Sequence, residues 1–92
     1  MATLTKDDIG TTWIDLVVDL SLVNSSSYII QNVSPYPMSL KESASLPTAD
    51  EFGHIVFPSE TWSFTVGSDG VYVRNQGDDN NKKILIAVTV SV

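Results

Sequence analysis

The sequence predicts a small all-β protein: an antiparallel β-sandwich of jelly-roll or immunoglobulin-like topology, or a partly closed barrel, with about seven strands. Three observations lead to this fold class. Apolar and polar residues alternate with a period of two in most apolar segments, which is typical of strands with one buried face. Residues that favour turns separate these segments at short intervals. The chain has 92 residues, 42% of them hydrophobic, which fits one domain with a single core.

The first predicted strand covers residues 12–20, after residues 1–11, which we interpret as a candidate flexible N-terminal arm of the single 1–92 domain. The alternation gives this strand an apolar face and a mixed face. The residues expected to face the core are Ile14, Leu16, Val18 and Leu20, and those expected on the opposite side are Trp13, Asp15, Val17 and Asp19.

The next three predicted strands cover residues 27–33, 38–42 and 52–57. Pro35 and Pro37 interrupt the chain between the first two of these, because proline lacks the N–H that a strand ladder needs. Residues 43–51 contain serine, proline and aspartate, and they predict a loop that carries the chain between sheets.

The last three predicted strands cover residues 61–66, 71–75 and 83–92. Gly77 and Asp78 favour a turn in the polar loop that precedes the final strand. This final strand is rich in β-branched residues and has no charge after Lys83. Such a strand would promote aggregation at an uncovered edge, so we expect it to be central in a sheet or paired across a subunit boundary.

The charge of the chain argues against nucleic acid as a partner. Five basic and eleven acidic residues give a net charge of −6. A phosphate backbone needs a basic stripe, and the five basic residues are too scattered to form one. No apolar run approaches the ~20 residues of a membrane-spanning helix, and the first ten residues do not resemble a signal peptide. We therefore expect no membrane partner and synthesis in a cytoplasm.

The residue inventory predicts no catalytic, cofactor-binding or metal-binding residue. His54 is the only histidine and the chain has no cysteine, so a cluster of several histidines or thiolates is impossible. We interpret His54 as a structural or surface residue. The acidic loop at residues 77–81 has oxygen ligands but lacks the spacing of a calcium loop, so we interpret it as a hairpin tip.

The aromatic residues are the most informative candidates for binding. Trp62 lies in phase with Phe64 and Val66, which predicts core packing. Trp13 lies opposite the apolar stripe, so it either anchors a protein interface or caps an open end of the sandwich. The candidate interface residues are Trp13, Asp15 and Val17 of the first strand, together with Tyr36 and Tyr72.

Five segments together resemble small cysteine-free β-sandwich accessory proteins of tailed bacteriophage virions, which decorate capsids or sit at fibre and tail attachment points. The resemblance implies a non-enzymatic structural role, as a homotrimer or another symmetric oligomer bound to capsid or tail proteins. The segments are YIIQN at 28–32, SLKESA at 39–44, FPSETWSFTV at 57–66, VYVR at 71–74 and ILIAVTV at 84–90.

The sequence therefore leads us to expect a structural protein of the virion, made in the cytoplasm of a bacterial host, as capsid decoration (cement) or as a head or tail accessory protein. The alternative is a carbohydrate-binding β-sandwich module. That function needs aromatic rings on one exposed surface, and Trp13, Tyr36 and Tyr72 are the rings available for it. An enzyme is the third and least supported class.

Overall fold

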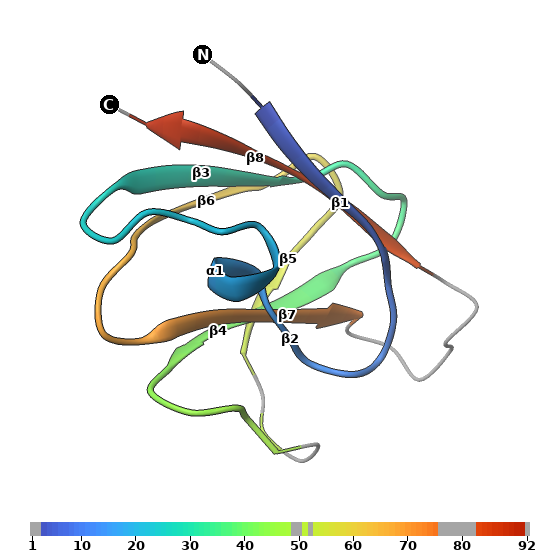
Figure 1. Ribbon diagram of the computed structural model, residues 1–92. Helices are drawn as coiled ribbons and strands as arrows, with labels where there is room; N and C mark the ends of the chain where they lie inside the picture. The colour runs from blue at the N-terminus through green and yellow to red at the C-terminus, as the bar shows by residue number, and fades with distance from the viewer. Residues whose placement is uncertain (1–2, 49–50, 52, 76–82, 92) are drawn as a thin grey trace.

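A computed structural model describes residues 3–48, 51, 53–75 and 83–91 of the chain. These residues form two antiparallel sheets of four strands each, packed face to face as a β-sandwich (Figure 1). The all-β class and the sandwich are confirmed, and the sheets do not close into a barrel.

The first sheet has the order β1-β8-β3-β6. Its central strands are β8 and β3, and its two edges are β1 and β6. The strands are β1 (Thr3–Ile9), β8 (Ile84–Ser91), β3 (Ser27–Asn32) and β6 (Thr61–Thr65).

The second sheet has the order β2-β7-β4-β5, with β2 and β5 at its edges. Both edge strands are short, with two residues in β2 and three in β5. The strands are β2 (Ile14–Asp15), β7 (Gly70–Asn75), β4 (Met38–Ser43) and β5 (His54–Val56).

The strand order defines a jelly roll, one of the two sandwich topologies that the sequence predicts. Strand pairs β1–β8, β2–β7, β3–β6 and β4–β5 are all antiparallel neighbours, as in one long hairpin rolled up on itself. The final strand is central, between β1 and β3, as its uninterrupted apolar sequence predicts.

The core lies between the two sheets and consists of the inward residues of the alternating pattern. Ile86 and Val88 of β8 and Leu40 and Val73 of the other sheet are fully buried in it. Burying a side chain of this size contributes about 1.5–3 kcal/mol of transfer free energy, so each of these residues stabilises the packing of the two sheets.

The N-terminal residues differ from the prediction of a flexible arm, because Thr3–Ile9 form the edge strand β1. The pattern is hard to recognise for two reasons. Lys6 occupies an inward position opposite Ile86 and forms an ion pair with Asp19 at 3.5 Å. The register then shifts between Lys6 and Ile9, where Asp8 has a positive φ of 58°.

The prediction of one strand over residues 12–20 is wrong in its second half, where Leu16–Asp19 form the single helical turn α1. Asp15 caps it, because one of its carboxylate oxygens accepts from the N–H of Val17 at 3.0 Å. As a result Val18 is 70% exposed instead of facing the core.

Candidate assembly surface

The middle of the outer face of the β1-β8-β3-β6 sheet carries no charged side chain among the described residues, and the charged Asp7 of β1 and Lys83 just before β8 lie at one border of it. The outer positions in this middle part alternate with the buried inward residues, so they point to solvent. We call this surface the uncharged face. It consists of Thr5 from β1, Leu85, Ala87 and Thr89 from β8, Ser27, Ile29 and Gln31 from β3, Val33 just after β3, and Thr61, Ser63 and Thr65 from β6.

Three large apolar residues of the uncharged face are exposed. Ile29, Val33 and Leu85 are 36%, 45% and 39% exposed, and the N–H of Val33 donates to the carbonyl oxygen of Leu85 at 3.0 Å. The cores of protein interfaces are depleted in charged residues, whereas ordinary surface carries many of them. An uncharged face on a chain with a net charge of −6 therefore has the composition of a protein contact surface.

Part of the outer face of the second sheet, over β4 and β7, is covered by the chain itself, whereas Ile55 of the edge strand β5 is 45% exposed. The connection between β4 and β5 folds back over the covered part, and Arg74 of β7 donates from Nη2 to the carbonyl oxygen of Glu51 at 2.7 Å. Lys41 of β4 donates from Nζ to Oε1 of Glu51, also at 2.7 Å. The Lys41 hydrogen bond and the N–H of Thr48 hold the pKa of the Glu51 carboxyl below its usual value.

Trp13 lies beneath this connection and is only 6% exposed. Its indole N–H donates to the carbonyl oxygen of Thr48 at 3.1 Å, and its ring stacks against the guanidinium of Arg74. A hollow of about 300 Å³ beside the ring is lined by Thr11, Thr12, Trp13, Leu46, Pro47 and Arg74. A partner would have to displace this connection to reach the ring, so the use of Trp13 as an interface anchor stays a prediction.

The other candidate interface residues also make contacts within the chain. Asp15 caps α1, and Val17 packs partly buried against the core. Tyr72 is 7% exposed on the outer side of β7, where its ring lies against Gly70. Tyr36 lies between β3 and β4 and packs against the core. The structure therefore does not bring Trp13, Tyr36 and Tyr72 together as an exposed platform for a sugar.

His54 and Trp62 form the accessible aromatic pair that sequence reasoning missed. Their ring centroids are 4.4 Å apart, and the contact joins β5 of one sheet to β6 of the other. Trp62 is only partly buried, because β6 is an edge strand. Its indole N–H is buried without a hydrogen-bond partner among the described residues. The alternating pattern identifies Trp62 as inward-facing but does not reveal that its strand lies at an edge.

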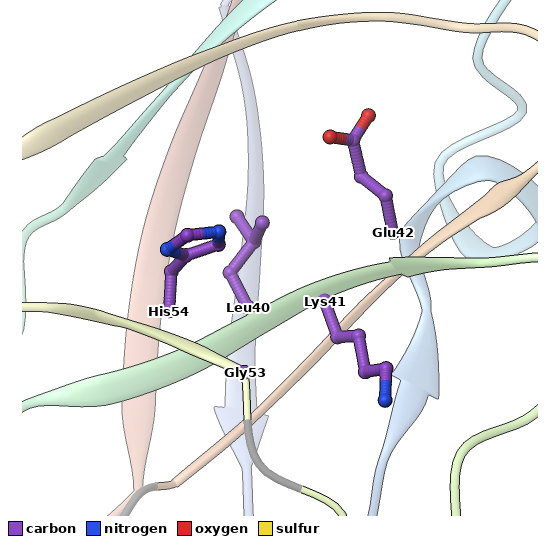
Figure 2. A pocket seen from close by; sticks show the side chains of 5 residues that line it. All are labelled: Leu40, Lys41, Glu42, Gly53 and His54. Atoms are coloured by element: carbon purple, nitrogen blue, oxygen red, sulfur yellow. The ribbon is translucent and has the colours of Figure 1, made fainter.

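A second, open hollow of about 450 Å³ lies beside His54 (Figure 2). It is lined by Leu40, Lys41, Glu42, Gly53 and His54. Figure 2 shows Leu40 and Glu42 on one side of β4 and Lys41 on the other, where Lys41 binds Glu51. Gly53 is required here because a Cβ would lie 2.3 Å from the carbonyl oxygen of Leu40. The lining of the hollow thus includes one imidazole, from His54, and one carboxylate, from Glu42.

Within the described ranges, no group of three or more histidine, cysteine or acidic residues could hold a metal ion. The acidic loop at residues 77–81 lies outside those ranges. Nor does any helix in the described part of the chain have the length and apolar character to cross a membrane.

We compared the chain with protein families, with curated proteins and with solved structures. No protein-family model matches the chain, and neither the curated proteins nor the solved structures give a match.

Proposed function

We propose that this protein is a non-enzymatic structural component of a bacteriophage virion, a capsid decoration (cement) protein or a head or tail accessory protein, which acts by protein–protein assembly. The observation that carries the proposal is the uncharged face, with Ile29, Val33 and Leu85 exposed on a strongly acidic chain. The resemblance of five sequence segments to phage accessory proteins supplies the biological setting, and jelly rolls are common in viral capsids.

The mechanism is docking of many copies on a repetitive particle. A face four strands wide, with strands ~4.8 Å apart and about 20 Å long, covers only about 400 Å² in projection. A stable interface buries roughly 800 Å² of accessible surface on each partner, so a contact confined to this small face is expected to be modest in size and weak for a single copy. Symmetric repetition on a particle raises the effective concentration and turns weak single contacts into stable attachment.

The proposal is tested by incorporation into particles. Tagged chain is produced in a bacterial host during infection by the phage that encodes it, and virions are purified on a density gradient. We expect the tagged chain to band with the virions in a fixed ratio to the major capsid protein. Its absence from gradient-purified virions would overturn the proposal.

A matched pair of variants locates the contact. Val33→Lys places a charge on the uncharged face, whereas Val23→Lys places the same charge at a 61% exposed position outside it. We expect Val33→Lys to reduce incorporation at least tenfold, because an unpaired charge in an interface costs more than 1.4 kcal/mol. Val23→Lys should be incorporated like the parent chain. Binding of the purified chain to a glycan array, with no incorporation into virions, would favour the carbohydrate-binding alternative.

A further inference from the structure

Three of the four sheet edges carry features that oppose pairing with another chain. Strands β2 and β5 have only two and three residues. Strand β1 has an inward-pointing Lys6 and an irregular register ending at Ile9. Short edges, bulges and inward charges are the usual means by which sheet proteins prevent edge-to-edge association.

Strand β6 has none of these features. It runs for five residues in unbroken register with β3, from Thr61 opposite Gln31 to Thr65 opposite Ser27, and contains neither proline nor charge. In the described part of the chain β3 is its only strand neighbour.

The hydrogen bonds to β3 show which peptide groups of β6 face the open side. The N–H of Asn32 donates to the carbonyl oxygen of Glu60, and the N–H of Val66 donates to that of Ser26. In an antiparallel strand, successive residues direct their peptide groups to opposite sides. Residues 60, 62, 64 and 66 therefore face β3, and Thr61, Ser63 and Thr65 direct their N–H and C=O groups away from it.

The sequence of β6 is self-complementary about Ser63. Thr-Trp-Ser-Phe-Thr has the same residue classes in both directions: threonine, aromatic, serine, aromatic, threonine. Antiparallel pairing of two copies about Ser63 places Thr61 opposite Thr65 of the other copy and Trp62 opposite Phe64. Aromatic pairs and threonine or serine pairs are the favourable cross-strand combinations.

We infer that two copies of this chain associate through β6, paired antiparallel about a two-fold axis at Ser63, so that two four-stranded sheets become one continuous sheet. The partly buried Trp62 then gains a second aromatic neighbour. The inference extends the proposed function, because it names a second copy of the chain as the partner at this edge. Its biological use rests on the proposed function.

Charge favours a second copy in this orientation. Two chains of net charge −6 repel each other, so their contact must keep carboxylates apart. Glu60 is the charged residue that immediately precedes β6. In the antiparallel pairing the two Glu60 residues lie six positions apart along the strands, or about 20 Å, which exceeds twice the ~8 Å screening length at physiological ionic strength.

Cysteine cross-linking of the isolated chain tests the register, because the chain has no cysteine of its own. Two Ser63 Cα atoms in a hydrogen-bonded pair lie about 5.5 Å apart, within disulfide range. Two Thr61 Cα atoms would lie about 13 Å apart, beyond that range. We expect oxidised Ser63→Cys to form covalent dimers and Thr61→Cys to remain monomeric, while Thr61→Cys/Thr65→Cys forms dimers again. Cross-linking of Thr61→Cys but not of Ser63→Cys would overturn the inference.

Sedimentation velocity tests the association without a covalent bond. The parent chain should show a concentration-dependent dimer. Ser63→Pro removes one N–H from the open side and none from the β3 ladder, so it should stay monomeric at every concentration with its β spectrum retained. Ser63→Ala, which keeps the N–H, should dimerise like the parent. A parent chain that stays monomeric at high concentration overturns the inference, even if it is a virion component. If the chain dimerises but is absent from virions, the proposed function is wrong and the inferred dimer stands.

Discussion

The guanidinium carbon of Arg74 lies 4.3 Å from the ring centroid of Trp13, and the same guanidinium donates to the carbonyl oxygen of Glu51. The two residues are far apart in sequence and meet because β2 pairs with β7, with Ile14 opposite Val73. Their stack fastens the connection between β4 and β5 to the outer face of the second sheet. The cluster made by Trp13, Lys41, Thr48, Glu51 and Arg74 is therefore a structural clamp.

Replacing Trp13 with alanine should destabilise the monomer. The substitution removes a ring that is 6% exposed, so we expect the free energy of unfolding to fall by about 3 kcal/mol. Urea denaturation followed by circular dichroism measures this loss. Val23→Ala, at a 61% exposed position, is the control and should change stability by no more than about 0.5 kcal/mol. An unchanged midpoint for Trp13→Ala would show that the connection over the ring contributes no stability.

Lowering the pH should weaken the structural clamp, because Glu51 becomes protonated. The pKa of this carboxyl is lowered in the folded chain, mainly by the hydrogen bond from Lys41, relative to its usual value of 4.5. A group with a lowered folded pKa stabilises the fold above its unfolded pKa, and this contribution disappears as the pH falls through the folded value. The melting temperature of the parent should therefore exceed that of Glu51→Gln at neutral pH, and the two should converge below pH 4.5.

The control for this pH series is Glu42→Gln, which changes a carboxylate on the other side of β4 (Figure 2). This variant keeps the hydrogen bond between Lys41 and Glu51, so its melting temperature at neutral pH should exceed that of Glu51→Gln. A constant gap between the parent and Glu51→Gln at all pH values would contradict the role given to this carboxylate.

Replacing Asn32 with alanine should be costly, because this buried amide links two connections at one end of the sandwich. Its Nδ2 donates to the carbonyl oxygens of Tyr36 at 2.7 Å and Val56 at 2.9 Å, and its Oδ1 accepts from Ser34. Asn32→Ala removes all of these hydrogen bonds of a fully buried side chain, so we expect a loss of about 3 kcal/mol.

Asn24→Ala is the matched control for that experiment, since Asn24 is exposed and also begins an Asn-x-Ser sequence. Its denaturation midpoint should stay close to that of the parent. If both variants melt alike, the hydrogen bonds of Asn32 contribute no net stability.

Gly53→Ala should strain the pairing of β4 with β5. The new Cβ would lie 2.3 Å from a backbone oxygen of Leu40, which cannot move without disturbing β4. We expect a loss of about 2 kcal/mol, typical of overpacking. At Gly67 a Cβ would meet nothing within 4 Å, so Gly67→Ala should be close to neutral. Thermal melts of the two variants make the comparison, and equal melting temperatures would contradict it.

The fold class and most strands could be predicted because alternation is a local signal. The jelly-roll order could not be distinguished from an immunoglobulin-like order, since it depends on pairings such as Thr3 with Thr89. The sequence does contain a signal for α1 that the alternation obscured. Trp13, Leu16, Val17 and Leu20 have helical spacing, all four are at least partly buried, and Asp15 is a suitable N-cap.

The candidate site was harder to predict than the fold. The position of Trp13 on the outer side of its sheet could be inferred from its phase, but the connection that covers it comes from residues more than thirty positions away. The uncharged face combines residues of four strands, and no single segment shows that all of them avoid charge. Such a surface becomes visible only once the register is known.

The central place of β8 determines when the protein can fold during synthesis. This strand pairs with β1 on one side and β3 on the other, yet it leaves the ribosome after the other seven. Until then, the nascent chain has a first sheet without its middle strand, and the inner edges of β1 and β3 are open to mispairing. Because these contacts join strands that are far apart in sequence, folding should take milliseconds to seconds, and the first sheet can close only after β8 has been made. Chaperones that bind exposed strands would therefore act on this chain until β8 is inserted between β1 and β3.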